Sequence, residues 1–553
     1  MAKQGILLLI ALFITAVSNG QADLKDWYHK SYGVSVDKTY TDLLKDRAGQ
    51  EVIVAIIDSG VDIEHEDLYA NVWVNADEIP GNGIDDDKNG YIDDIHGWNF
   101  IGGPDGSHVG PETYEATRLY AKLRTKYEKI DSASLKGKEL EEYNRYKTFK
   151  EEVERKRKQA ESQVEQFEPL VGTVMSALEA ISGELPSDTI TPASVADIPG
   201  SDQMINIGKS ILSQIFKDEK ADTMIFSELK QVIDLELTGE LANLRKDLDY
   251  HYNPDYDSRK EIVKDNYNDG KERIYGNNDV EGPDPLHGTH VAGIVGAIRN
   301  NDIGMNGVAP HVKIMSIRTV PDGDERDKDV ANAIRYAVDN GASIINMSFG
   351  KGHSWDKEIV DDAVKYADKK DVLMVHAAGN SSQNNDTSMN FPNDTYDKGV
   401  GFLFWKRKNP KSWIEVGALS HAMEGKEVSG FSNYGAEEVD VFAPGDQIYS
   451  TMPNDNYAYL QGTSMASPVV AGAAAVLRSY FPKLKASQVK EIIMESSRKL
   501  DIEVTKPGTS ERVPFSTLSK SGGVIDLYQA FLLASKTKGK KKLKKNKKKD
   551  TGA

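Results

Sequence analysis

The sequence predicts an α/β fold in which a mainly parallel sheet lies between two layers of helices, with a long helical insertion. Residues 51–57 (EVIVAII) form the continuous β-branched run of a strand buried on both faces. After residue 284, short apolar runs alternate with amphipathic segments, which is typical of a parallel sheet wrapped on both sides. Between these parts, residues 112–250 are dominated by Glu, Lys, Arg and Leu in helical patterns.

Each element follows from its local pattern. Strands are expected at 51–57, 312–318, 343–347, 372–378, 413–418 and 439–442, and helices at 287–299, 330–340, 358–369, 464–480 and 488–496. Residues 73–100 are rich in Asp, Asn and Gly, which predicts a loop. A Pro/Ser/Thr-rich stretch at 185–202 breaks the insertion, which we expect to contain long antiparallel helices.

The N-terminus has the pattern of a secretory signal peptide. Lys3 supplies the positive charge and residues 6–17 the apolar run, while small residues at 16, 18 and 20 predict cleavage between 18 and 21. A membrane anchor would need roughly 20 apolar residues. We therefore expect export to the periplasm, the cell surface or the medium, and no transmembrane segment after the signal is removed.

Composition limits the partners and the chemistry. The chain of 553 residues has a formal charge of −18 although residues 536–549 form a dense lysine run, so the remainder is still more acidic. An acidic body disfavours nucleic acid as a partner. The absence of cysteine excludes disulfides, a thiolate nucleophile and Cys-ligated zinc. The lysine run is expected to be a solvated tail, with contact to anionic surface polymers or lipid headgroups as the alternative.

Four polar residues stand at the ends of predicted elements and together suit acyl transfer. Asp58 ends the first strand, His287 opens a helix, Ser464 lies at another helix start, and Asn380 follows the strand at 372–378. Peptide hydrolysis by serine needs a hydroxyl, a base, a carboxylate that orients the base, and donors to the oxyanion. Taken singly, Asp58 could be a turn cap and Ser464 an N-cap; together with Asn380 they favour catalysis.

The motifs around these residues resemble those of subtilisin-like serine proteases. DSGVD, HGTHVAG, INMSFG, AAGN and GTSMASPVVAG occur in that family's order over residues 23–110 and 284–497. The resemblance implies a secreted serine endopeptidase in which Asp58 orients His287, His287 acts as base and then acid, and Ser464 attacks the carbonyl. It also implies that Asn380 stabilises the oxyanion. The substrate-binding residues it implies are Ser348, Phe349, Gly350, Ala377, Ala378 and Gly379.

The resemblance divides the chain into five parts. These are a signal peptide (1–20), two parts of the catalytic domain (21–110 and 256–530), the helical insertion (111–255) and a basic disordered tail (531–553). About thirty residues separate the signal from the first strand, which is too few for a separate folding prodomain. The insertion is either a surface decoration or a lid or docking arm, and residues 381–411 also look enlarged.

Other readings of the same residues remain open. His290 and His65 are expected to be structural histidines, because a triad needs only one base. The chain could instead be an inactive scaffold used for binding, although a binding role would not require all four polar residues. An esterase would share the same acyl-transfer groups, so only substrate trials separate it from a peptidase.

An acidic loop predicts a calcium site. Asp85, Asp87, Asn89, Tyr91 and Asp93 occupy positions one, three, five, seven and nine of a calcium-loop pattern, with glycine at position six. Position twelve is His96 rather than Glu, and no helix pair flanks the loop. The alternative is a solvated acidic turn. Because so many carboxylates repel one another, we expect a structural Ca²⁺. The whole segment at 73–100 also resembles an insertion of some bacterial subtilisin-like proteases.

Overall fold

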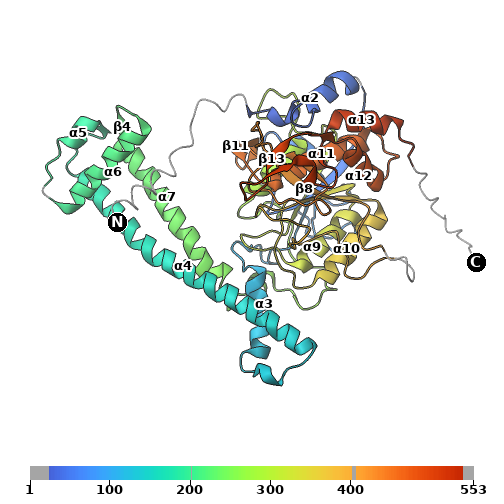
Figure 1. Cartoon of the computed structure of the whole chain (residues 1–553), viewed down its shortest axis with the longest axis horizontal. Helices are drawn as coiled ribbons and strands as arrows, with labels where there is room; N and C mark the ends of the chain where they lie inside the picture. Colours follow the sequence, from blue (N-terminus) through green and yellow to red (C-terminus); the bar gives the residue numbers. More distant parts are fainter. Residues whose placement is uncertain (1–23, 46, 201, 401–406, 540–553) are drawn as a thin grey trace, which may run out of the picture. The chain divides into compact units, whose positions relative to one another are not determined.

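The computed structural model describes residues 24–45, 47–200, 202–400 and 407–539, which fall into two compact units. Residues 116–256 form one unit, and the described segments before and after them form the other (Figure 1). The predicted signal peptide and most of the lysine run lie outside the described residues. None of the described helices combines the length and apolar character needed to cross a bilayer.

The larger unit is built on a nine-stranded sheet in the order β12-β15-β9-β8-β7-β6-β1-β5-β2. Its strands are β1 (Val52–Asp58), β2 (Gly97–Asn99), β5 (Val312–Arg318), β6 (Ile344–Met347), β7 (Leu373–Ala377), β8 (Trp413–Leu419), β9 (Val441–Pro444), β12 (Arg498–Lys499) and β15 (Gly523–Val524). All neighbours pair in parallel except β12 with β15. The predicted mainly parallel sheet is therefore confirmed.

Helices cover both faces of this sheet. They are α8 (Leu286–Gly296), α9 (Asp327–Asp339), α10 (Lys357–Lys370), α11 (Thr463–Tyr480), α12 (Ala486–Glu495) and α13 (Leu527–Lys536). Successive side chains of a strand point to opposite faces. Accordingly, Val54 and Ile56 of β1 belong to a core shared with α8 and α11, whereas Ala55 and Ile57 belong to a core shared with α9 and α10. The three-layer α/β/α prediction is thus confirmed.

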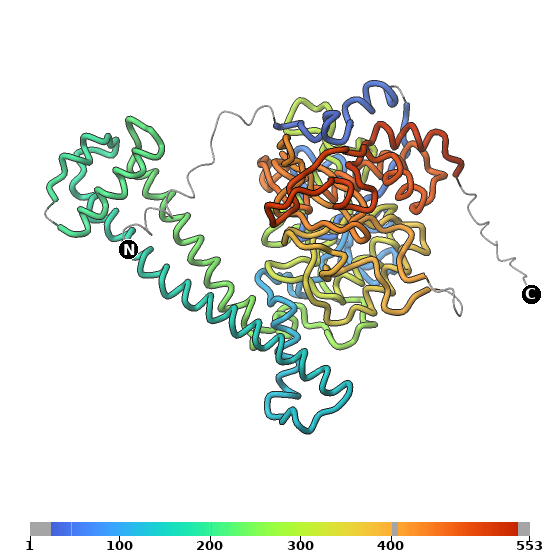
Figure 2. Tube along the Cα trace, viewed as in Figure 1, coloured from blue at the N-terminus to red at the C-terminus, as the bar shows by residue number. Residues whose placement is uncertain are grey.

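The smaller unit is helical. It holds most of α3 (Glu115–Tyr127), together with α4 (Lys138–Ser182), α5 (Pro192–Ala196), α6 (Gln203–Glu219) and α7 (Phe226–Lys246). Helices α4 and α7 run antiparallel, because Glu168 pairs with Arg245 while Glu179 pairs with Lys230. The two appear as adjacent cyan and green rods in Figure 2. Aliphatic side chains of α4 and α6 supply a separate core for this unit.

The structure differs from the predicted elements in several places, and short strands such as β12 and β15 were not predicted. Helix α8 ends at Gly296 rather than at 299, because Ala297 adopts an extended conformation (φ −55°, ψ 145°). The expected loop at 73–100 contains β2, which pairs with β5. A hairpin of β10 (Ile448–Met452) and β11 (Asn456–Leu460) was not predicted. Helix α13 continues into the expected tail because Phe531 and Ala534 are buried.

Gly97 allows β2 to approach β5 closely. Its φ is +134°, and a Cβ atom built there would lie 1.7 Å from the carbonyl oxygen of Ser316. Gly97→Ala should lower the melting temperature by about 5 °C, because backbone must move to relieve the overlap. Gly81→Ala is the control, since Gly81 also has positive φ (+72°) but no atom within 4 Å of the added Cβ. Calorimetry should show a much smaller shift for the control; equal shifts would contradict the steric argument.

Candidate active site

The candidate catalytic residues gather at one edge of the parallel sheet. Strands β1, β6 and β7 are neighbours and run in the same direction, so their carboxyl ends meet at that edge. Asp58 is the last residue of β1, Ser348 follows β6, and Ala377 ends β7. Sites of open α/β sheets form at this edge.

Asp58 and His287 form a hydrogen-bonded pair. The Asp58 Oδ1 atom lies 2.7 Å from His287 Nδ1 and also accepts the backbone N–H of Ser59 at 2.8 Å. Asp58 is buried, whereas the His287 side chain is 35% exposed. Burial lowers the pKa of His287, but the charge and hydrogen bond of Asp58 raise it by more, so its pKa lies above the ordinary value.

Glycine is required where α8 meets β1. A Cβ atom on Gly288 would lie 2.0 Å from the carbonyl oxygen of Gly60 and 3.2 Å from the Asp58 Cβ. The missing side chain therefore lets the first turn of α8 approach the end of β1, which brings His287 within reach of Asp58.

Ser464 is the second residue of α11, and it contacts the segment that follows β6. Its hydroxyl donates to the Ser348 carbonyl oxygen at 3.0 Å, while the Ser348 hydroxyl donates to the Ser464 carbonyl oxygen at 2.8 Å. Within the described part of the chain, no hydrogen bond joins Ser464 to His287. The structure thus joins Asp58 to His287 and Ser464 to Ser348.

The side-chain amide of Asn380 lies beside the start of α11, close to Ser464. Its Oδ1 atom accepts both the backbone N–H and the hydroxyl of Thr463, each at 2.9 Å. Because a backbone N–H can only donate, this contact fixes which end of the Asn380 amide is oxygen. A Cβ on Gly462 would lie 3.3 Å from Asn380 Nδ2 and 3.6 Å from the Ser464 backbone nitrogen. Two nitrogens that carry N–H groups therefore lie close to the space left by that glycine.

The two predicted substrate segments are joined by a residue that the sequence did not single out. Asn390 donates to the carbonyl oxygens of Ala377 (3.3 Å) and Ala378 (3.1 Å). Its Oδ1 would lie 2.6 Å from a Cβ on Gly350. Nothing in the sequence distinguishes Asn390 from the other asparagines of residues 381–411, so only the fold reveals this contact.

The two histidines that the sequence analysis interprets as structural each contact backbone groups. His290 is buried with Nε2 3.1 Å from the Ala458 carbonyl oxygen, and burial lowers its pKa to about 3. His65 is buried, with Nδ1 accepting the backbone N–H of Asp67 and Nε2 3.2 Å from the Asn456 carbonyl oxygen. Both have the environment expected of structural histidines.

The acidic loop brings together a carboxylate set that only partly matches the predicted one. Carboxylate oxygens of Glu78, Asp87 and Asp94 lie within 4.8 Å of one another. Burial raises the pKa of Asp94 to about 6, and the charge of Asp87 adds to this. The sequence pattern identified Asp87 but missed Glu78 and Asp94, which lie outside the positions of a calcium-loop motif.

The remaining predicted ligands have protein partners of their own. Asp85 accepts the backbone N–H groups of Asn89 and Gly90, and Asp93 accepts those of Asn82 and Gly83. The Asn89 amide donates to Asp87 and Asp94. The Tyr91 hydroxyl donates to the Arg273 carbonyl oxygen at 3.1 Å.

Comparison with known proteins places the chain in a family. The model of the subtilase family matches residues 49–513. A thermophilic serine proteinase of Bacillus sp. (strain AK1) is 42% identical over 195 residues, which cover 35% of this chain and 42% of that protein. Subtilisin DY of Bacillus licheniformis is 39% identical over 218 residues, which cover 39% of this chain and 71% of that protein. Thermitase of Thermoactinomyces vulgaris is 37% identical over 217 residues, covering 39% and 68%.

The chain thus spans less than half of the length of the first of these relatives and about two thirds of the other two. The family match, by contrast, covers most of this chain and includes all four strand-end and helix-start residues described above. The chain belongs to the subtilase family.

Proposed function

We propose that this protein is a serine endopeptidase that cleaves peptide bonds through Asp58, His287 and Ser464 and an acyl-enzyme intermediate. The observation that carries this proposal is that the Asn380 amide nitrogen and the Ser464 backbone nitrogen, both N–H donors, lie close to one space beside the Ser464 side chain. Donors held in place before the reaction stabilise a developing oxyanion.

Acylation begins with proton transfer from serine to histidine. Because His287 Nδ1 is engaged by Asp58, its Nε2 is the free basic nitrogen. The Ser464 hydroxyl turns from the Ser348 carbonyl to this nitrogen and gives up its proton as its oxygen bonds to the substrate carbonyl carbon. The resulting oxyanion is held by Asn380 and the Ser464 N–H, and the imidazolium then protonates the leaving amine as the C–N bond breaks.

Deacylation repeats these steps with water. His287, now neutral again, takes a proton from a water molecule that attacks the acyl carbon. The second tetrahedral oxyanion occupies the same donors, and His287 returns the proton to Ser464 as the acid product leaves.

Substrate binding is assigned to the segments after β6 and β7. Ser348, Phe349 and Gly350 would pair with an extended peptide as an added strand. Ala377, Ala378 and Gly379 would line the side-chain pocket with them, and Asn390 lies between the two segments.

Calcium is assigned a structural role. The carboxylates of Glu78, Asp87 and Asp94 are hard oxygen ligands, and burial, with a smaller contribution from the charge of Asp87, raises the pKa of Asp94. Bound Ca²⁺ would relieve the repulsion between these carboxylates and stiffen the loop. We assign this calcium no step in the reaction, since the acylation and deacylation steps above use only Asp58, His287, Ser464 and Asn380.

Export is also part of the proposal. It rests on the signal-peptide pattern of residues 1–20, and one of the relatives is a cell wall-associated protease of Bacillus subtilis. Sequencing of the N-terminus of the secreted product tests it; a mature protein that still begins at Met1 would contradict it.

A fluorophosphonate probe tests the nucleophile. Wild-type protein in calcium should label covalently, because His287 activates the Ser464 hydroxyl, and it should digest casein. Ser464→Ala should abolish both activities, whereas Ser467→Ala is a matched control on the same helix, with its hydroxyl bonded to Asn346 instead. Labelling that survives in Ser464→Ala would refute the assignment.

The pH profile tests the Asp58–His287 pair. Activity needs neutral His287, so kcat/KM should fall as the pH drops through the raised pKa of this histidine. Asp58→Asn should lower kcat by about 10⁴-fold and move the acid limb to lower pH, because burial still lowers the pKa of His287 while the raising charge is gone. Asp284→Asn, which removes a weaker raising charge, should move the limb less. An unmoved limb in Asp58→Asn would contradict the pairing.

Thermal unfolding tests the calcium assignment. Excess chelator should lower the melting temperature of the wild type by several degrees, since ligand at about 100 times its Kd contributes about 2.7 kcal/mol. Asp94→Asn should lose most of this calcium-dependent shift. Asp77→Asn should keep it, because Asp77 is exposed and lies outside the cluster. Equal shifts in both variants would remove the assignment.

A further inference from the structure

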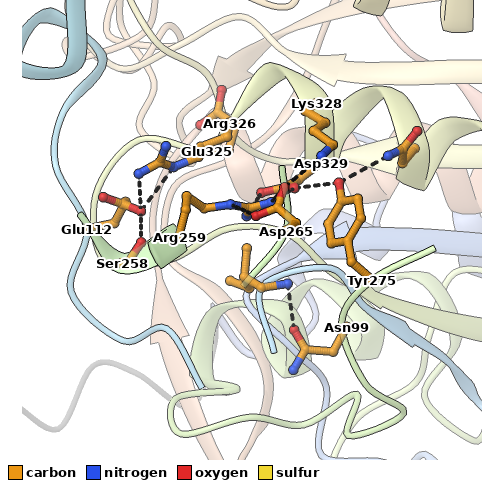
Figure 3. Close-up of polar contacts among 12 residues, drawn as sticks. Asn99, Glu112, Ser258, Arg259, Asp265, Tyr275, Glu325, Arg326, Lys328 and Asp329 are labelled. Atoms are coloured by element: carbon orange, nitrogen blue, oxygen red, sulfur yellow. Dashed lines mark hydrogen bonds and ion pairs between the residues drawn. The ribbon is translucent and has the colours of Figure 1, made fainter. Parts of the chain in front are cut away.

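A buried ion network surrounds the first turn of α9. Glu112 accepts two hydrogen bonds from Arg326, at 3.1 and 2.9 Å, and one from the Ser258 hydroxyl. Asp329 accepts the guanidinium of Arg259 at 2.8 Å. Figure 3 shows Glu112 between Ser258 and Arg326, with Arg259 beside Asp329. We give the name root network to these groups, to Asp265 and Lys328, which extend the ion pairs of Arg259, and to the separate buried cluster in which Lys351 pairs with Asp327 and Glu115. Its members are Glu112, Glu115, Ser258, Arg259, Asp265, Arg326, Asp327, Lys328, Asp329 and Lys351.

The root network lies where the chain leaves the larger unit and where it returns. Glu112 and Glu115 are the last residues before the helical unit of residues 116–256, and Ser258 and Arg259 are among the first after it. Glu112, before the helical unit, pairs with Arg326 at the N-cap of α9, and Arg259, after it, pairs with Asp329 in the first turn of the same helix. The chain therefore leaves and re-enters the larger unit at a single fixed point.

One member of the network belongs to a different segment. Lys351 directly follows Gly350, and its side chain is 1% exposed. Its Nζ atom lies 2.8 Å from Asp327 Oδ1 and 3.5 Å from Glu115 Oε2, and it donates to the Glu325 carbonyl oxygen at 2.6 Å. A buried ammonium is tolerated only when paired and hydrogen-bonded in this way.

The backbone of Lys351 is held as well. Lys351 and Phe391 exchange two backbone hydrogen bonds, of 2.9 and 2.8 Å. Phe391 follows Asn390, whose amide bonds the carbonyl oxygens of Ala377 and Ala378. Lys351 is thus fixed to the root network by its side chain and to the wall of the candidate pocket by its backbone.

We propose that Lys351 is a positioning residue that holds the substrate-binding segment Ser348–Gly350 in register against the root of the helical insertion. The inference rests on the proposed function, since it assigns a role to a segment named there. At its other end this segment is held by Ser464 through Ser348. Both ends of the strand that would receive the substrate are therefore anchored, one to the nucleophile and one to Glu115 and Asp327.

A comparison of a long substrate with a small probe distinguishes a positioning role of Lys351 from a general contribution to stability. A tetrapeptide p-nitroanilide, taken from a casein site that the wild type cleaves, must pair with Ser348–Gly350, whereas the fluorophosphonate probe needs only the nucleophile and the oxyanion donors. Lys351→Met should lower kcat/KM for the tetrapeptide by about tenfold to a hundredfold, mainly through KM, because a misplaced binding segment costs alignment. Its fluorophosphonate labelling rate should stay within about twofold of wild type.

Substitution of Glu115 should disturb the Lys351 contact less than Lys351→Met does, and substitution of Asp265 is the matched control. The carboxylate of each is fully buried (0%) within the root network, but only Glu115 contacts Lys351; Asp265 pairs with Arg259 and Lys328. Glu115→Gln should weaken tetrapeptide turnover by about threefold and add little to Lys351→Met in the double variant, because the two residues act through one contact. Asp265→Asn should lower the melting temperature and leave the length dependence unchanged.

The outcomes are distinct. A loss selective for the tetrapeptide in Lys351→Met and Glu115→Gln supports positioning. Equal losses with both probes, or a selective loss in Asp265→Asn as well, overturn it. If the wild type neither labels nor cleaves, the proposed function fails instead. In that case the affinity of Ser464→Ala for casein peptides of increasing length decides, because binding needs no catalysis. Adding Lys351→Met to this variant must lower its affinity for the longer peptides. Unchanged affinities would overturn positioning.

Discussion

Parallel pairing of β1 with β6, and of β6 with β7, is the constraint on which the site depends. It brings three strand ends to one edge, where Asp58, Ser348 and Ala377 follow from the register. Helices α8 and α11 then add His287 and Ser464 from their first turns. The strands and helices that carry these side chains are fixed by their packing in the core. The geometry of the site therefore follows from the core.

The fold and the polar residues of the site could be predicted because their signals are local. A β-branched run such as 51–57 has few alternatives to a buried strand, and β5 begins and ends as predicted. Asp58, His287, Ser464 and Asn380 stand at element boundaries, where polar residues interrupt apolar patterns. Family motifs add their order, and the family match covers them all.

Features that depend on contacts between distant segments could not be predicted from the sequence. Glu78 joins Asp87 and Asp94 only after the loop folds back, so a linear calcium motif finds just one of the three. Strand β2 is short and needs the edge of β5 to form. Lys351 carries no motif, and its burial is intelligible only beside Asp327 and Glu115, which lie more than twenty residues away in sequence. The ion pairs of Lys351 join segments that the sheet does not connect.

A crystal structure of the Ser464 adduct with a peptide boronic acid tests the central claim most directly, because the boronate reproduces the tetrahedral intermediate. The account predicts a bond between boron and the Ser464 oxygen. It also predicts one boronate oxygen about 3 Å from both Asn380 Nδ2 and the Ser464 backbone nitrogen, and His287 still bonded to Asp58. An adduct on another residue, or a boronate oxygen that points away from Asn380, would contradict it.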